Sequence, residues 1–386
     1  MSANPRILAL FGARVILGSE RGNIEALSAL QEEGCKILCL VRNEKWNDHI
    51  AETLSARGFT CRKVPYIDNW QRGWRLWILF RNPVAFLVGN WKLLAICRKY
   101  RPTHIYAFNQ FYVLNFFLAL TLVRTPMIYR AGDAPTLHRW VWQALWQFVV
   151  WRTQQFVAIS KFVARVLEES GVTGERVEVI YSRPPAREAK SEYAVLPQVE
   201  PGRKDVVFVG QIIEAKGPHL LIEAFGRLAD EFPGARLLIV GRISDWSGDD
   251  WARHLHNRVM QDPLLADRVF FTGFVEDVPS LLLRCEVLVV PSLVEEALGN
   301  VVLEAKEAGI PAIVFPSGGL PELIEHGEDG FVCKEKSVYA LTTNLRHYLE
   351  DPLLARRHGA AARASLARLG VYEFAKRWME VCRRSA

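Results

Sequence analysis

Short apolar runs alternate with longer stretches of helical period along the first half of the chain. Residues Arg6–Gly12 and Lys36–Val41 are near-continuous apolar runs, separated by a helical stretch that ends near Glu33, just before Gly34. Strands that are buried on both faces of a parallel sheet show this lack of alternation. The pattern predicts a doubly wound α/β domain. Further strands are expected at His104–Phe108, Pro126–Arg130, Gln155–Ile159 and Val177–Tyr181.

The pattern breaks at residues 182–204 and then restarts. This segment contains two consecutive prolines and a Pro-Gly pair, and it follows neither period, which is typical of an interdomain linker. After it, Asp205–Val209 opens a second set of strand-like runs, and helices are expected at His219–Leu228 and Asn300–Ala308. The other strands of this set are expected at Arg236–Val240, Arg268–Thr272, Val287–Val290 and Ala312–Phe315.

The alternation therefore predicts two Rossmann-like domains. The first covers residues 1–185, the linker covers 186–204, and the second domain covers 205–370. Residues 371–386 have apolar positions at helical spacing, and we expect this helix to pack back on the N-terminal domain. A length of 386 residues agrees with this organisation, because it exceeds what one hydrophobic core usually supports.

Composition narrows the class of protein. Half of the residues are apolar and 23% are charged, which is a globular balance. The seven cysteines are scattered without a Cys-x-x-Cys pair, and no secretory signal is recognised, so we expect reduced thiols and no cysteine metal site. The longest apolar stretch, Phe111–Val123, is interrupted by Asn115 and is shorter than the ~18–20 residues of a spanning helix. We expect it to be a buried core helix.

Charge is distributed unevenly between the two halves. Residues 1–185 carry 24 Lys/Arg against 13 Asp/Glu, a balance of +11, whereas the remainder carries 24 against 29, a balance of −5. A basic first half and a mildly acidic second half indicate that the two halves meet different partners.

The strongest chemical motif runs from Pro291 to Glu304, directly after a buried strand and into the expected helix. A glycine, Gly299, allows a ligand to approach the backbone closely, and Asn300 is a good helix N-cap. The first amides of such a helix favour an anion, so a diphosphate fits there. Carboxylates suit hydroxyl groups, so of Glu296 in the loop and Glu304, one turn into the helix, one would face the sugar and the other the ribose. An ordinary helix start with two surface glutamates is the alternative.

A second motif, Phe208–Gly217, follows the first strand of the second domain. It places a glycine turn at Gly210 and then Lys216 beyond the carboxyl end of that strand. A lysine there is a natural counter-charge for a diphosphate in the same crevice. A solvated loop lysine is the alternative for Lys216 taken alone.

Together these segments resemble family 4 of the retaining glycosyltransferases, whose C-terminal domains carry a Gly-Arg-x-x-x-x-Lys-Gly turn and a Glu-x7-Glu motif. The resemblance covers about residues 205–335, and in the first domain Gly18-Ser19-Glu20-Arg21 looks like the glycine loop of the family. Other matching segments are Leu221-Ile222-Glu223-Ala224-Phe225, Val240-Gly241, Phe271-Thr272-Gly273-Phe274 and Gly318-Gly319-Leu320-Pro321-Glu322-Leu323-Ile324.

The resemblance implies a fold and an activity. The fold is the GT-B type, in which two Rossmann-like domains face each other across a cleft. The activity is transfer of a sugar from a nucleotide diphosphate sugar (UDP or GDP), with retention of configuration and without a metal or other cofactor. The acceptor would be a lipid-linked or cell-envelope glycan, bound mainly by the first domain.

The resemblance also implies roles for individual residues. Glu296 would be catalytic at the donor sugar, Glu304 would bind the ribose, and Lys216 with the Gly299–Val301 backbone would bind the diphosphate. Gly18 would let the first domain's loop close over the donor. The donor-binding positions implied in this way are Gly18, Gly210, Gln211, Lys216, Gly241, Val275, Leu298, Gly299, Asn300, Val301 and Glu304.

The sequence departs from the family at two places. Gln211 stands where the family usually has an arginine, which removes one charge from the diphosphate site. The frequent histidine at the end of a first-domain strand is absent from the matching stretch, Tyr129-Arg130-Ala131-Gly132-Asp133. Asp133 is therefore a second candidate catalytic residue, with Arg130 and His138 as alternatives for this polar role.

Tryptophans and basic residues are concentrated in the first domain. Residues 62–101 hold nine Lys/Arg and one acid, and nine of the twelve tryptophans fall between Trp46 and Trp151. This combination suits the headgroup layer of an anionic membrane, so we expect a peripheral protein on the inner, cytoplasmic face of a membrane. An aromatic core beneath a solvated basic face is the alternative. No nucleic-acid module is visible, and no nucleic-acid partner is expected.

Two rival functions use the same evidence differently. A nucleotide-sugar epimerase shares the two-domain shape but needs no acceptor, and the Glu-x7-Glu spacing disfavours it. A non-catalytic scaffold with a decayed donor site is favoured only by Gln211. Incubation with nucleotide sugars distinguishes the three functions by transfer, by epimerised donor or by no turnover.

Overall fold

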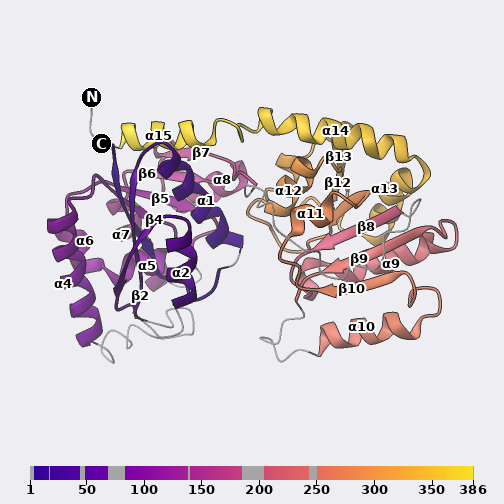
Figure 1. The fold of residues 1–386 in the computed structure, drawn as a ribbon, viewed down its shortest axis with the longest axis horizontal. Helices are drawn as coiled ribbons and strands as arrows, with labels where there is room; N and C mark the ends of the chain where they lie inside the picture. The colour runs from indigo at the N-terminus through magenta and orange to yellow at the C-terminus, as the bar shows by residue number, and fades with distance from the viewer. Residues whose placement is uncertain are drawn as a thin grey trace. The chain divides into compact units, whose positions relative to one another are not determined.

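The computed structural model describes residues 4–16, 18–43, 48–67, 83–137, 140–184, 204–242 and 250–385. The chain divides into two compact units. Unit 1 consists of residues 1–183 together with 372–386, and unit 2 consists of residues 184–371. Each unit is a parallel sheet with helices packed on it (Figure 1).

Unit 1 contains a seven-stranded parallel sheet with the order β3-β2-β1-β4-β5-β6-β7. Its central strands are the apolar runs of the sequence, and every residue of β4 and β5 is buried. Continuous burial is expected of a parallel strand that is covered on both faces. The strands are β1 (Arg6–Phe11), β2 (Lys36–Arg42), β3 (Thr60–Val64), β4 (His104–Ala107), β5 (Met127–Ala131), β6 (Gln155–Ala158) and β7 (Val177–Val179).

Helices of unit 1 cover this sheet, and three of them share one hydrophobic core with it. These are α1, α2 and the C-terminal helix α15, whose Trp378 is fully buried and lies 5.7 Å, ring to ring, from Tyr106 of β4. The last helix of the chain thus belongs to the core of unit 1. The helices are α1 (Gly18–Glu32), α2 (Asp48–Ala56), α4 (Pro83–Tyr100), α5 (Gln110–Asn115), α6 (Phe117–Leu122), α7 (Trp140–Arg152), α8 (Lys161–Glu169) and α15 (Phe374–Arg384).

Unit 2 contains a six-stranded parallel sheet with the order β10-β9-β8-β11-β12-β13. Alternate residues of its strands form one core cluster with α9, α10 and α13, whereas α12 contacts β11 and β12. The strands are β8 (Lys204–Val209), β9 (Ala235–Val240), β10 (Val269–Gly273), β11 (Val287–Val290), β12 (Ala312–Val314) and β13 (Gly330–Val332). The helices are α9 (Pro218–Ala229), α10 (Trp251–Gln261), α11 (Val278–Leu282), α12 (Asn300–Ala308), α13 (Val338–Glu350) and α14 (Pro352–Arg368).

The structure confirms the strands expected from the apolar runs, to within one or two residues at their ends. It adds two strands that the pattern did not reveal. The edge strand β3 has the sequence Thr-Cys-Arg-Lys-Val and is mostly exposed, and β13 has only three residues. Neither segment offers a run of apolar residues long enough to be recognised. Residues 186–203 of the expected linker lie outside the described residues.

The expectation of one buried helix at Phe111–Val123 is wrong. The segment forms two short helices, α5 and α6, which meet at Phe116. The side chain of Asn115 explains the break, because it accepts a hydrogen bond of 2.6 Å from the Ile67 amide and is held in the core. The second helix is partly exposed, with Leu122 at 70%. In the described residues, no helix has the length and apolar character needed to cross a membrane.

Candidate functional site

The centre of the sheet in unit 2 is where its strand order reverses, between β8 and β11. Ligands of doubly wound sheets bind at such a switch point, beyond the carboxyl ends of the strands. The loop after β8 carries Gly210 and Lys216, and the loop after β11 carries Glu296 and leads into α12. Both motifs singled out in the sequence therefore reach the same edge of the same sheet.

Two glycines bring the loops after β8 and β9 together. Gly241 has a φ of +153°, and a Cβ at this position would lie 1.8 Å from the carbonyl oxygen of Gly210. The amide of Gly210 donates to Val240 O over 2.9 Å, and that of Gly241 donates to Gly273 O over 2.9 Å. Only glycine fits at residue 241, so the backbone at this edge is fixed by packing.

Lys216 ends a short 3-10 turn, Glu214–Lys216, that is docked on the loop after β11. The amide of Leu293 donates to Ala215 O over 2.9 Å. Gly217 follows with a φ of +70°, and its Cβ would lie 2.0 Å from Pro291 O. The glycine therefore permits the close backbone contact that brings the lysine to the second motif.

Lys216 and Glu296 form an ion pair. The distance between Lys216 Nζ and Glu296 Oε1 is 2.5 Å, and the two side chains are 28% and 17% exposed. The same carboxylate oxygen accepts a hydrogen bond of 2.6 Å from the hydroxyl of Ser292, which is fully buried. Sequence reasoning missed Ser292; its position two residues after a buried strand and four residues before Glu296 was the available signal.

The backbone around Glu296 is held by a turn after β12. The amide of Gly319 donates to Glu296 O over 2.7 Å, and the amide of Gly318 donates to the carboxylate of Glu295. Gly318 has a φ of +57°, and its Cβ would lie 2.2 Å from Glu296 O. Glycine at the start of the Gly318–Ile324 segment is thus explained by the close approach of the backbone at Glu296, which leaves no room for a side chain.

Gly299, with a φ of +92°, is the N-cap residue of α12, and no side chain caps this helix end. The expectation that Asn300 is the N-cap is therefore wrong, because Asn300 is the first helical residue. A Cβ on Gly299 would lie 2.3 Å from Leu320 Cδ2, so the adjacent turn leaves no room for a side chain at the cap. Val301 and Glu304 are half-buried and Leu298 is buried. The helix presents its first amides at this edge, as an anion site requires.

The remaining expected donor positions lie on neighbouring loops of unit 2. Gln211 is exposed in the loop after β8, and Val275 is half-buried in the loop after β10. Next to Val275, the ring of Phe274 lies 4.4 Å from the guanidinium carbon of Arg242. Of the expected residues of this unit, the structure brings Lys216 and Glu296 into direct contact.

In unit 1, Gly18 is the first residue of α1, and Gly18-Ser19-Glu20-Arg21 forms the first turn of this helix. These residues therefore begin a helix and do not form a loop, and the closing of this segment over the donor stays a prediction. A Cβ on Gly18 would meet no atom within 4 Å. Gly18 and Asp133 both lie at the carboxyl-end edge of the sheet of unit 1, where β1 and β5 end.

The substitutes for the missing histidine differ in burial. Asp133 is exposed in the loop after β5, and His138 lies outside the described residues. Arg130 is only 2% exposed, and its Nη2 donates to Ser182 Oγ over 2.9 Å. Burial lowers the pKa of Arg130, and the charge of Asp133 opposes this shift. Among the described residues of the chain, no group of three or more His, Cys, Asp or Glu could hold a metal ion.

Two family models match the chain, one on each unit. The model of glycosyl transferases group 1 matches residues 196–365, and that of glycosyltransferase family 4 matches residues 16–182. The chain belongs to the group 1 glycosyltransferases of family 4. The family recognised from the Glu-x7-Glu motif and the lysine turn is confirmed.

Curated relatives match over part of their length. Spore coat protein SA of Bacillus subtilis is 36% identical over 140 residues, which are 35% of this chain and 36% of that protein. A GDP-mannose-dependent alpha-(1-6)-phosphatidylinositol monomannoside mannosyltransferase of Mycolicibacterium smegmatis is 32% identical over 169 residues, 42% of each protein. The chain therefore covers about two fifths or less of the length of these relatives.

Solved structures match over nearly the whole length of the chain. Anabaena Alr3699/HepE in complex with UDP and glucose has a TM-score of 0.76 at 21% identity and covers 98% of this chain and 100% of its own. Sucrose-phosphate synthase of Thermosynechococcus elongatus has a TM-score of 0.75 at 19% identity, with 99% of each chain covered. At these identities the likeness shows the fold, and the expected GT-B class with two Rossmann-like domains is confirmed.

Proposed function

We propose that the protein transfers a sugar from a nucleotide diphosphate sugar to a glycan acceptor, and that unit 2 binds the donor. The observation that carries this proposal is the Lys216–Glu296 pair at the switch point of unit 2, beside the uncapped start of α12. A cation and a helix N-terminus suit the diphosphate, and a neighbouring carboxylate suits the sugar. The names of similar proteins support the donor class, because they mention UDP and GDP-mannose.

The bond changes follow from this arrangement. The bond between the anomeric carbon and the diphosphate oxygen breaks, and its electron pair leaves with the nucleoside diphosphate. A hydroxyl oxygen of the acceptor forms the new bond to the same carbon and releases its proton to the solvent. Lys216 and the first amides of α12 stabilise the charge that develops on the leaving diphosphate, so the proposal includes no metal. Glu296 faces the sugar as positive charge develops there, and retention of configuration is part of the proposal by family resemblance.

The proposal places the acceptor with unit 1 and the whole enzyme at an anionic membrane, on its inner face. Exposed apolar side chains of unit 1 support this. Helices α4 and α6 are in contact, and the rings of Phe117 on α6 and Phe148 on α7 lie 4.3 Å apart. We call six of the exposed apolar residues of these three helices the apolar face: Val84, Leu87 and Trp91 of α4, Leu118 and Leu122 of α6, and Trp151 of α7.

Basic residues accompany the apolar face. Arg98 and Lys99 are exposed in the last turn of α4, and Arg98 follows Trp91 at an interval of seven residues, which places both on one side of the helix. Large apolar patches on a surface mark interaction sites, and neighbouring cations favour an anionic lipid surface. The buried Trp142 and Trp146 belong to the core, and Trp46, Trp70, Trp74 and Trp77 lie outside the described residues.

Incubation of the protein with UDP- and GDP-sugars, with and without lipid-linked acceptors, tests the proposal. We expect release of nucleoside diphosphate that depends on an acceptor, together with a glycosylated product of retained configuration. An epimerised donor would replace the proposal by an isomerase. Absence of both turnover and nucleotide binding with all donors would favour a scaffold without a donor site.

A further inference from the structure

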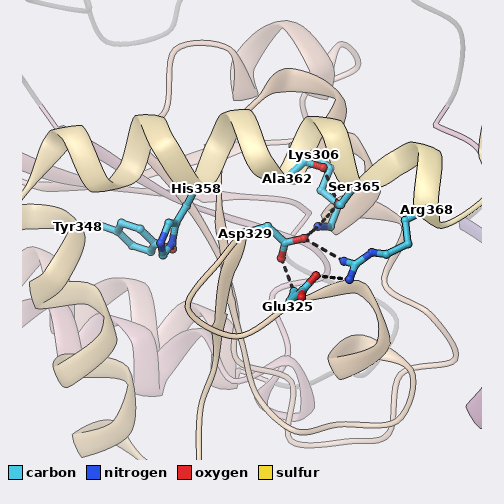
Figure 2. Close-up of polar contacts among 8 residues, drawn as sticks. All are labelled: Lys306, Glu325, Asp329, Tyr348, His358, Ala362, Ser365 and Arg368. Carbon is cyan, nitrogen blue, oxygen red and sulfur yellow. Dashed lines mark hydrogen bonds and ion pairs between the residues drawn. The ribbon is translucent and has the colours of Figure 1, made fainter.

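A buried cluster of charged residues joins the helix of the donor site to two other elements of unit 2. Lys306 of α12 and Asp329, in the turn before β13, are 1% and 2% exposed, and their Nζ and Oδ2 atoms lie 2.8 Å apart. Lys306 Nζ also donates to Ser365 Oγ of α14 over 2.8 Å. Figure 2 shows the carboxylate of Asp329 joined to both Lys306 and Arg368, with Ser365 beside the ammonium group.

The cluster is balanced in charge and connected by hydrogen bonds. Arg368 Nη2 lies 3.4 Å from Asp329 Oδ2, and the other end of its guanidinium pairs with Glu325. The second oxygen of Asp329 accepts a hydrogen bond of 2.8 Å from the Glu325 amide. Burial lowers the pKa of Lys306, and the hydrogen bond to Asp329 opposes this shift. The cluster therefore combines two cations and two carboxylates, and its innermost pair is shielded from water.

The location of Lys306 on α12 is what connects this cluster to the donor site. Residues 304 and 306 are two positions apart and so project about 200° from each other around the helix. Glu304 shares its side of α12 with Asn300, one turn before it. Lys306 thus holds the opposite side of the helix, and a fixed contact there fixes the rotation of the side that carries Glu304.

Apolar packing alone defines the position of α12 less sharply. Its buried side chains Val302, Leu303 and Ala305 make van der Waals contacts, which have no preferred direction and tolerate a small rotation or shift of the helix. Hydrogen bonds, in contrast, have directional preferences. The backbone contact between Gly309 and Gly359, where a Cβ on Gly359 would lie 2.0 Å from Gly309 O, holds the other end of the helix. Replacing a buried ion pair by apolar residues often costs no stability, which makes such a pair more informative about specificity than about stability.

We propose that Lys306 is a positioning residue for the donor site: through Asp329 and Ser365 it sets the orientation of α12, and thereby of the amides and the carboxylate that receive the donor. The inference rests on the proposed binding of a nucleotide diphosphate at the start of this helix. Lys306 touches no donor itself. A displacement of about 1 Å in a group remote from the chemistry is enough to lower turnover substantially.

Three variants separate positioning from stability. Lys306→Met keeps the length of the side chain and removes its charge, and the double variant with Asp329→Asn also neutralises the partner while keeping an oxygen for the Glu325 amide. Arg363→Met is the matched control, because Arg363 Nη2 and Glu307 Oε1 form an exposed pair of 3.9 Å between the same two helices. The dissociation constants for UDP and GDP and the midpoint temperature of unfolding are measured for each protein. Binding is measured at a temperature well below the lowest of these midpoints, so that every variant is folded.

We expect Lys306→Met to lower the midpoint and to weaken binding of the preferred nucleotide about tenfold. In the double variant the midpoint recovers, because no buried charge is left unpaired, but binding stays weak. The control binds as the parent does. Parent-like binding in both Lys306 variants, or binding that recovers together with the midpoint, overturns the proposal. If Lys306→Met does not fold, the double variant decides. A parent that binds neither UDP nor GDP overturns the proposed donor site, and this inference with it.

Discussion

The two sheets share the same order around their first strands, β2-β1-β4 in unit 1 and β9-β8-β11 in unit 2, but their switch points are built differently. In unit 2, glycines at 217, 241, 299 and 318 pack against neighbouring atoms at distances that exclude a side chain, and a lysine pairs with a glutamate. In unit 1, Gly12 at the end of β1 packs against the rings of Tyr66 and Tyr112 and not against backbone, Gly18 has open space around it, and Asp133 is exposed.

This difference follows from what each half is proposed to bind. A diphosphate is recognised by backbone amides and one or two charges, so its site depends on backbone geometry that only glycine permits. An acceptor glycan offers hydroxyl groups, which side chains on exposed loops can recognise in many ways. Unit 2 accordingly has a preorganised site, and unit 1 has a scaffold with polar groups at its edge.

The largest effect is expected from adding a methyl group to a tightly packed glycine of unit 2. Gly241→Ala places a Cβ 1.8 Å from Gly210 O at a φ of +153°, so the loops after β8 and β9 must separate. We expect a loss on the order of 3 kcal/mol in the free energy of unfolding and loss of nucleotide binding. Chemical denaturation and calorimetric titration with UDP and GDP measure both.

Gly18→Ala is the corresponding change in unit 1. Because Gly18 lies in the first turn of α1 with no atom within 4 Å of its Cβ, we expect unchanged or slightly increased stability. Equal destabilisation by the two substitutions would show that the two switch points do not differ in the way described.

A smaller effect is expected from removing the charge of Glu296. Glu296→Gln keeps an oxygen for the Ser292 hydroxyl, so the fold is preserved, but the sugar loses a carboxylate as positive charge develops. We expect kcat to fall by about 10²–10³ with little change in nucleotide affinity. The matched control is Glu295→Gln, one residue earlier, whose carboxylate is 54% exposed and pairs with Lys336. Near-parental kcat for Glu296→Gln would remove this residue from the catalytic role.

Prediction from the sequence succeeded for elements whose local pattern is compatible with only one kind of secondary structure. Apolar runs gave the central strands, and a glycine before a helical pattern gave the start of α12 to the residue. The N-cap was misassigned because Asn300 and Gly299 are both good caps, and what decides is the space left by Leu320, which is distant in sequence. Propensity is local, whereas this choice is made by tertiary packing.

The polar contacts of the site were less predictable for the same reason. The pairing of Lys216 with Glu296 joins residues 80 positions apart, and only the adjacency of β8 and β11 brings them together. The cluster at Lys306 was not predicted at all. A lysine on a helix is normally exposed, and its burial depends on Asp329 and Ser365, which lie 23 and 59 residues further along the chain.

The two units are expected to differ in how much a single polar side chain contributes to nucleotide affinity. Lys216→Gln removes the cation of the donor site, and loss of a charge-assisted contact costs about 1.5–3 kcal/mol, or roughly tenfold to a hundredfold in affinity. Asp133→Asn, at the edge of unit 1, should leave the affinity for UDP or GDP unchanged and alter turnover only. If Asp133→Asn weakens nucleotide binding as much as Lys216→Gln does, donor recognition is not confined to unit 2.

The smallest expected effect concerns the apolar face of unit 1. Basic side chains near an anionic surface contribute about 1 kcal/mol each before screening by salt, whereas inserted apolar side chains contribute a part that salt does not remove. We therefore expect the protein to bind vesicles containing anionic lipid, to bind neutral vesicles weakly, and to retain part of its binding at high salt. Sedimentation with the two vesicle types at low and high salt measures this.

Two variants divide these contributions between charge and apolar contact. Arg98→Gln with Lys99→Gln should weaken binding about thirtyfold at low salt and little at high salt, because only the screened part is lost. Trp91→Ala with Leu122→Ala should weaken vesicle binding at both salt concentrations, because these side chains are 65% and 70% exposed and would lie in the lipid headgroups.

Arg356→Gln with Arg357→Gln is the matched control, a pair of exposed adjacent cations on α14 of unit 2. If substitution of the control pair reduces binding as much as substitution of Arg98 and Lys99 does, the attraction to the membrane arises from the net charge of the whole protein and not from unit 1. Equally poor binding of the parent to both vesicle types would assign the basic residues of unit 1 to an anionic acceptor free in solution.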